Sequence, residues 1–178
     1  MKIQEKAIYL IGFMGAGKST VARCLCKMYG LQLVEMDETI ASEEGMSIPD
    51  IFATKGEAYF RSRETTLLER AAQAGTVISC GGGVAMRQEN VRLMQEKGIV
   101  VLLKATPETV FERVKYSTDR PLLNGNMTLE HVSELLEVRR PYYEATAEVT
   151  ILTDGKTPEE ICKEIEIACY NLDGQDKS

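Results

Sequence analysis

Five short apolar runs alternate with amphipathic stretches along the 178-residue chain, and this order constrains the fold more than any other feature. The runs cover residues 7–11, 31–36, 76–79, 99–103 and 148–152. They are continuously apolar, which is typical of parallel strands that are buried on both faces. We therefore predict a three-layer α/β/α sandwich around a five-stranded parallel sheet. Ligands in such folds bind at the carboxyl ends of the strands, so the loops that follow the runs are the places to look for function.

The stretches between the runs have helical periodicity, and many of them stop at a glycine. We predict helices at 18–29, 37–44, 47–55, 57–74, 87–97, 107–115, 128–143 and 158–172. The segment from about 115 to 127 contains Pro121, Asn124 and Gly125, which makes it long and irregular enough to act as a lid. We expect residues 1–172 to form one domain, with helices at about 37–64 binding a substrate, and 173–178 to be a frayed tail.

The loop after the first run matches the phosphate-binding pattern G-x-x-x-x-G-K-[ST] from Gly12 to Ser19. Glycines let backbone N–H groups point at phosphate oxygens, and the following helix adds the positive end of its dipole. Lys18 would contact the β- and γ-phosphates of ATP, and Ser19 would ligate Mg²⁺. The glycine spacing differs from the G-x-G-x-x-G of dinucleotide-binding folds. The ATP-binding candidates in this loop are Gly15, Ala16, Gly17, Lys18, Ser19 and Thr20.

Two acidic residues, Glu35 and Asp37, follow the second run. The N-K-x-D guanine motif of GTP switches is absent from the sequence, and the fourth run ends in Lys104 rather than in the acid that is usual in ATP-driven motors. We expect Glu35 and Asp37 to lie two apart on one extended segment, with both side chains on the same side. One acid could then hold an acceptor hydroxyl or accept its proton, while the other holds a magnesium-bound water. The alternative is that Asp37 only caps the next helix.

The composition excludes several classes of partner. A net charge of −6 argues against nucleic acid and anionic membranes, which need a basic face. No apolar run reaches 18 residues, so no membrane span is expected. Five cysteines without C-x-x-C spacing indicate reduced thiols in the cytoplasm, and a single histidine, to which we assign no chemistry, argues against a zinc site. The reduced thiols lead us to expect a cytoplasmic protein. No apolar face is left over for contact with a second copy, so we also expect a monomer.

Several separated motifs in this order resemble the shikimate kinase family across about residues 7–165. Besides the Gly12–Thr20 loop and Glu35-Met36-Asp37, the resemblance depends on Ser47–Phe52, Gly56-Glu57 with Phe60-Arg61, Gly81-Gly82-Gly83, Arg120–Leu123 and Arg139–Tyr143. It implies a P-loop fold of the nucleoside-monophosphate-kinase type. It also implies transfer of the ATP γ-phosphoryl group to the 3-hydroxyl of shikimate, with Mg²⁺ as cofactor.

The resemblance also implies roles for individual residues. The catalytic residues would be Lys18, Asp37 and Arg120, with Asp37 binding shikimate hydroxyls and Arg120 reaching the phosphates from the lid. Arg61 and Arg139 would hold the shikimate carboxylate, as a planar guanidinium matches a carboxylate in two hydrogen bonds. The remaining implied contacts are adenine with Arg113, magnesium-bound water with Glu35, and substrate with the backbone of Gly81, Gly82 and Gly83.

Other functions remain open at this point. The nearest enzymatic alternative is a P-loop kinase for gluconate or a nucleoside monophosphate, and the alternative from another class is a nucleotide-binding module without catalysis. This chain also departs from the family pattern at two positions. Glu35 stands where members often have aspartate, and Lys156 stands where some have an arginine beside the adenine.

Overall fold

The computed structural model describes residues 3–116 and 126–175, and these form a parallel sheet of five strands in the order β2-β3-β1-β4-β5. The three inner strands are β3 (Thr76–Ser79), β1 (Ala7–Ile11) and β4 (Gly98–Lys104). The edge strands are β2 (Gln32–Glu35) and β5 (Val149–Leu152). Every pairing in the sheet is parallel, so the predicted fold class is confirmed.

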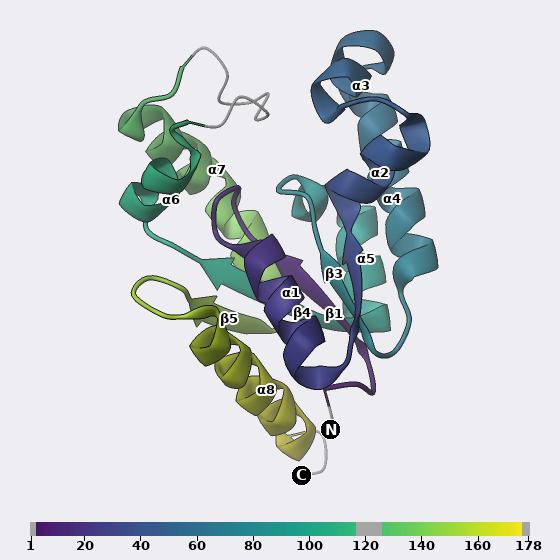
Figure 1. Cartoon of the computed structure of the whole chain (residues 1–178), viewed down its shortest axis with the longest axis vertical. Coiled ribbons are helices and arrows are strands. Elements are labelled where there is room, and N and C mark those ends of the chain that lie inside the picture. Colours follow the sequence, from purple (N-terminus) through teal and green to yellow (C-terminus); the bar gives the residue numbers. More distant parts are fainter. Residues whose placement is uncertain (1–2, 117–125, 176–178) are drawn as a thin grey trace.

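Helices cover both faces of the sheet (Figure 1). On one face, α1 (Lys18–Tyr29) and α8 (Pro158–Gln175) pack together over a core that includes Leu10 and Val101. On the other face lie α4 (Glu57–Ala71), α5 (Gln88–Lys97), α6 (Pro107–Val114) and α7 (Leu129–Thr146), over a core that includes Tyr9. The structure therefore has the three layers that the sequence predicts.

The inner and edge strands differ in burial. β1 and β3 are buried at every position, and β4 is buried up to Leu103. β5 alternates between buried and exposed residues, and β2 has no fully buried residue. The expectation of continuous burial is thus correct for the centre of the sheet and wrong for its edges, because an edge strand has a partner on one side only.

The clearest correction concerns the two acids after β2. Glu35 is the last residue of β2 and the N-cap of α2 (Met36–Glu44), and Asp37 is already the second residue of that helix. The two acids therefore do not share an extended segment. The alternative that Asp37 is the helix cap is also wrong, since Glu35 occupies that position and makes no side-chain capping bond.

Other boundaries differ by a few residues. The chain adds a short 3-10 turn, η1 (Val84–Met86), after the three glycines, while α7 and α8 each continue three residues beyond the predicted end. α3 (Ile48–Lys55) begins at the predicted cap, where Ser47 accepts a hydrogen bond from the Asp50 N–H.

The elements beside the strand ends lie in two groups (Figure 1). α2 and α3 extend upward on one side of the view, and α6 with the start of α7 extends on the other. Of the predicted lid, residues 117–125 lie outside the described residues, and so does the expected phosphate contact Arg120. Within residues 3–116 and 126–175, no helix has the length and apolar character needed to cross a membrane.

Candidate active site

The Gly12–Thr20 loop connects β1 to α1 in a conformation that needs its glycines. Gly12, Gly15 and Gly17 have φ angles of 143°, 78° and 96°, a region that L side chains rarely adopt. A Cβ on Gly12 would lie 2.5 Å from the Leu103 carbonyl oxygen, so the loop also needs the space that glycine leaves. The Ala16 N–H donates to the Phe13 carbonyl at 3.1 Å, which closes the loop internally.

Two cations lie against this loop. The Lys18 Nζ donates to the carbonyls of Gly12 at 2.7 Å and Phe13 at 3.0 Å, so the ammonium group lies across the loop. Arg113 reaches the loop from α6 and donates to the Gly15 carbonyl at 2.8 Å. A cavity of about 390 Å³ opens here, and among its lining residues are Gly15, Gly17, Lys18, Ser19, Thr20 and Arg113. Ala16 is buried beneath the loop and is not part of this lining.

Oxygen ligands suited to Mg²⁺ lie at the edge of the same cavity. The Ser19 hydroxyl donates to Glu35 Oε2 at 2.8 Å and lies 3.4 Å from the Ser79 hydroxyl. The other carboxylate oxygen of Glu35 makes no hydrogen bond, although Arg23 Nη2 lies 3.3 Å away. Mg²⁺ is held by few protein ligands and keeps several waters and phosphate oxygens, so a hydroxyl with one carboxylate fits it. The described residues contain no cluster of three or more His, Cys, Asp or Glu side chains that could form a complete protein cage.

A second cavity, of about 340 Å³, lies between α2, α3, α4 and α7. Part of its wall is apolar, from Ile48, Pro49, Phe52 and Phe60, and part of it is cationic, from Arg61 and Arg139. The two cavities share Met14, Asp37, Glu38, Gly81 and Gly82. Asp37 therefore faces both, although α2 rather than an extended segment carries it.

The two arginines come from different helices and are both oriented by aromatic rings. The Arg61 guanidinium lies 5.3 Å from the ring centre of Phe60 and 5.9 Å from that of Phe52. The Arg139 guanidinium lies 5.8 Å from the ring centre of Phe13. Such cation–π contacts favour one orientation of each guanidinium plane. The structure thus brings together the two arginines that sequence analysis selected 78 positions apart.

The three glycines after β3 lie between these side chains. A Cβ on Gly81 would be 2.5 Å from Glu64 Oε1 and 3.1 Å from Asp37 Oδ1. One on Gly82 would be 3.2 Å from Arg139 Nη1, and one on Gly83 would overlap the Arg61 guanidinium. The run is therefore more than a turn, because each glycine leaves room for a different polar group of the cavity.

Each of the three comparisons with known proteins finds shikimate kinases. The family model described as shikimate kinase matches residues 14–169. The chain belongs to the shikimate kinase family. A shikimate kinase from Dehalococcoides mccartyi is 46% identical over 93% of this chain and 94% of the relative. One from Persephonella marina is 46% identical over 89% and 95% of the two chains. A solved structure titled as the shikimate kinase from Acinetobacter baumannii in complex with shikimate superposes with a TM-score of 0.89, with 33% identity and coverage of 95% of this chain and 96% of that one.

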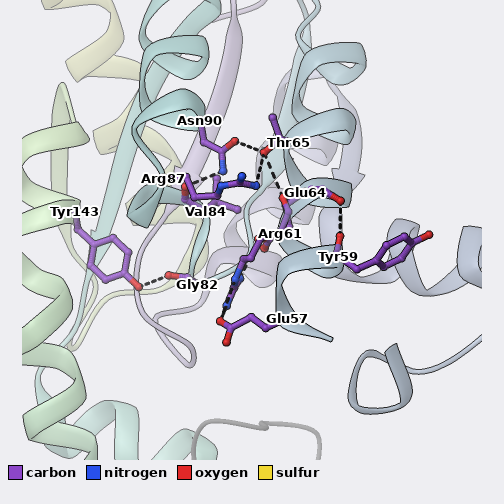
Figure 2. Close-up of polar contacts among 11 residues, drawn as sticks. Glu57, Tyr59, Arg61, Glu64, Thr65, Gly82, Val84, Arg87, Asn90 and Tyr143 are labelled. Carbon is purple, nitrogen blue, oxygen red and sulfur yellow. Dashed lines mark hydrogen bonds and ion pairs between the residues drawn. The ribbon is translucent and has the colours of Figure 1, made fainter. Parts of the chain in front are cut away.

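Sequence analysis of this shikimate kinase family member missed Glu64. This glutamate of α4 is fully buried, and its Oε2 accepts a hydrogen bond from Arg61 Nη1 at 2.9 Å. Arg61 also pairs with Glu57, at 3.1 Å, so two acids of the same helix hold it (Figure 2). The signal that could have revealed Glu64 is its spacing three residues after Arg61, which puts both side chains on one helix face.

Burial has the largest effect on the pKa of Glu64. Loss of water raises the pKa of Glu64 to about 7, with Asp37 adding to the rise, while Arg61 and Arg139 oppose it. The pKa of Arg61 is raised because Glu64 and Glu57 together outweigh the opposing effect of burial. Burial thus brings the pKa of Glu64 close to neutral pH, beside the Arg61 guanidinium.

A buried hydrogen-bond network supports α4 from behind (Figure 2). The Thr65 hydroxyl donates to Asn90 Oδ1 at 2.7 Å, and Asn90 Nδ2 donates to the Val84 carbonyl at 3.0 Å. Arg87 Nη1 donates to the same Thr65 hydroxyl at 3.3 Å. The network links the Arg61 helix to η1, which directly follows the three glycines.

Proposed function

We propose that this member of the shikimate kinase family transfers the γ-phosphoryl group of ATP to the 3-hydroxyl of shikimate, giving shikimate 3-phosphate and ADP. The observation that carries the proposal is the junction of the two cavities. One is lined by a phosphate-binding loop and the other by two guanidinium groups, and Asp37 borders both. An acceptor hydroxyl placed at Asp37 would lie beside the terminal phosphate of a nucleotide in the loop.

The nucleotide would occupy the cavity of the Gly12–Thr20 loop. The N–H groups at the start of α1 and the Lys18 ammonium favour the negative charge of the β- and γ-phosphates. Arg113, held against the Gly15 carbonyl, would line the adenine end. Lys156 is less suited to that contact, because its Nζ is paired with Glu164 at 2.8 Å. We also propose Arg120, which lies outside the described residues, as the cation that stabilises charge on the transferred group.

Mg²⁺, when bound, would neutralise negative charge on the phosphates of ATP. Ser19 would ligate the ion through its hydroxyl, and Glu35 would hold one of its water ligands. The 2.8 Å contact between the two side chains supports this division, since both oxygens lie at one place on the wall of the nucleotide cavity.

The acceptor cavity matches a small hydroxylated carboxylate. Arg61 and Arg139 would bind the carboxylate of shikimate, and the backbone N–H groups of Gly81–Gly83 would contact the ring substituents. The apolar wall of Ile48, Pro49 and Phe52 would cover a face of the ring. A nucleoside monophosphate fits less well, because its phosphate carries more charge and Arg61 is already paired with two acids.

Asp37 would perform the proton chemistry. Its carboxylate accepts hydrogen bonds from two vicinal hydroxyls and takes the proton of the attacking one, or orients that hydroxyl in line with the γ-phosphate. We propose that residues 1–172 act as one kinase domain, with the helices at 37–64 on the acceptor side. We further propose that the protein is a monomer and that it acts in the cytoplasm. The five free thiols support the second proposal, because a reducing compartment keeps cysteines unpaired.

The reaction is tested by measuring ADP release with shikimate, gluconate and nucleoside monophosphates as acceptors. We expect ADP release and a phosphorylated product with shikimate, and background rates with the others. If only a nucleotide or gluconate were phosphorylated, the proposal that shikimate is the acceptor would be wrong.

The placement of the carboxylate is tested with Arg61→Ala. Removing one guanidinium from a buried charge pair costs about 2 kcal/mol or more, so the KM for shikimate should rise at least about 30-fold while the KM for ATP stays near its original value. Arg140→Ala is the matched control. Arg140 directly follows Arg139 in the sequence, but its guanidinium pairs with the exposed Glu137. An unchanged shikimate KM in folded Arg61→Ala would move the carboxylate site elsewhere.

A further inference from the structure

The Glu64 carboxyl group is an acid that phosphoryl transfer does not use. It has no exposed surface, and only Oε2 is hydrogen-bonded, to Arg61 Nη1 at 2.9 Å. Its Oε1 has no hydrogen-bond partner and points toward Gly81, where an added Cβ would lie 2.5 Å away. An ionised carboxylate in this position is satisfied on one side only, which is costly for a charge with no exposed surface.

Charged and titratable groups from three helices and one loop surround Glu64. Arg61 lies on the same helix, with Glu57 on its other side. Asp37 of α2 disfavours the charge of Glu64, and Arg139 of α7 favours it. The Cys80 thiol, just after β3, lies close enough to be affected by the charges of both Glu64 and Asp37, and burial raises its pKa, so it stays neutral. Arg61 is thus the only cation of this group that is hydrogen-bonded to Glu64 among the described residues.

We propose that Glu64 takes up a proton from solvent when the carboxylate of the substrate binds to Arg61, so that acceptor binding is linked to proton uptake. The inference rests on the proposed placement of that carboxylate on Arg61. The step is a simple protonation, in which the ionised Glu64 carboxyl and one buffer proton give a neutral carboxylic acid, and no bond of the substrate forms or breaks.

The physical reason is competition for one guanidinium. In the free protein Arg61 neutralises Glu64 within a buried site. A bound carboxylate would add a second negative charge beside the same cation, and two carboxylates that share a low-dielectric site do not both stay ionised. Glu64 has no exposed surface and its Oε1 lacks a hydrogen bond, so it is the one that accepts the proton. The neutral acid then leaves the full charge of Arg61 to the substrate.

The pKa of Glu64 in the free protein makes the proposed proton uptake measurable. With a pKa of about 7 in the free protein, Glu64 is mostly ionised at pH 8 and mostly protonated at pH 6. Proton uptake on binding should therefore be large at pH 8 and small at pH 6. The affinity for shikimate should fall as the pH rises from 6 to 8, because binding then requires a proton that the free protein no longer carries.

The test is isothermal titration calorimetry of shikimate binding to the full chain, in two pH 8 buffers that differ in ionisation enthalpy. We expect uptake of more than about half a proton per shikimate at pH 8 and a small fraction of that at pH 6, as linkage requires. Glu64→Gln keeps the size of the side chain and one oxygen that can accept from Arg61, but it cannot take up a proton near neutral pH, so it should abolish the uptake. Glu69→Gln removes an exposed acid farther along the same helix and should leave the uptake unchanged.

Two results would overturn the proposal: no uptake by the original chain at pH 8, or equal uptake by Glu64→Gln. If Glu64→Gln does not fold, infrared difference spectra of the original chain decide the question, because binding must produce a protonated carboxyl band at pH 8, and its absence contradicts the proposal. Arg61→Ala separates the two hypotheses. If that variant binds shikimate normally, the carboxylate placement is wrong; if it binds weakly but the original chain takes up no proton, only the role of Glu64 is wrong.

Discussion

Each glycine from 81 to 83 lies against a different polar group, and this is the strongest residue-scale constraint on the acceptor cavity. Gly81 adjoins Glu64 and Asp37, Gly82 adjoins Arg139, and Gly83 adjoins Arg61. None of the three has a positive φ, so the reason for glycine here is space rather than backbone conformation. A single methyl group added to this run would move a charged side chain.

Gly83→Ala tests this reading. The new methyl group would overlap the Arg61 guanidinium, so the arginine must shift, and displacement of a binding group by about 1 Å can cost up to about 100-fold. We expect steady-state kinetics to show a KM for shikimate raised at least about 10-fold, with little change in the KM for ATP. Gly82→Ala should have a smaller effect, because its methyl group would be 3.2 Å from Arg139 Nη1. Equal kinetics for Gly83→Ala and the original chain would contradict the packing argument.

At the scale of elements, the sequence predicted best those features that depend only on residues close together in the chain. The phosphate loop is a local pattern, and its strand and helix have the predicted boundaries. The relation of Glu35 to Asp37 was predicted wrongly, because the chain turns from β2 directly into α2 between them. Glu64 was missed because it lies on the buried face of α4 beside Leu67 and Leu68, where hydrophobic periodicity leaves no place for a charged residue.

The buried network behind α4 gives an element-scale prediction. Asn90→Ala removes the side-chain donor to the buried Val84 carbonyl, and an unsatisfied buried group costs about 1–3 kcal/mol, while the Thr65 hydroxyl keeps the Arg61 carbonyl as an acceptor at 3.2 Å. We expect urea unfolding to show a loss of roughly 1–3 kcal/mol in the free energy of unfolding. Glu96→Ala is the control on the same helix, because Glu96 is exposed, and it should change the free energy by less than about 0.5 kcal/mol. Similar unfolding curves for the two variants would show that the network contributes little.

At the scale of the whole molecule, the site forms because parallel strands end at one edge of the sheet. That edge brings together the chain segments that directly follow β1, β2 and β3, which carry Lys18, Asp37 and the three glycines. Sequence order could predict this convergence from the strand pattern alone. It could not predict that α2–α4 and α7 enclose a separate acceptor cavity, because that depends on how helices far apart in the chain pack. The overall charge of −6 does not prevent phosphate binding, since Lys18 and Arg113 both lie against the loop.

The central claim is that Asp37 joins the two cavities into one phosphoryl-transfer site, and Asp37→Asn tests it most directly. The amide keeps the shape of the side chain but cannot accept the proton of the acceptor hydroxyl, a contribution of about 10²- to 10⁴-fold. The turnover number with shikimate should fall by a factor within that range. The affinity for ATP, measured by titration without shikimate, should stay within a few-fold of that of the original chain. Turnover within a few-fold of the original chain would contradict the claim.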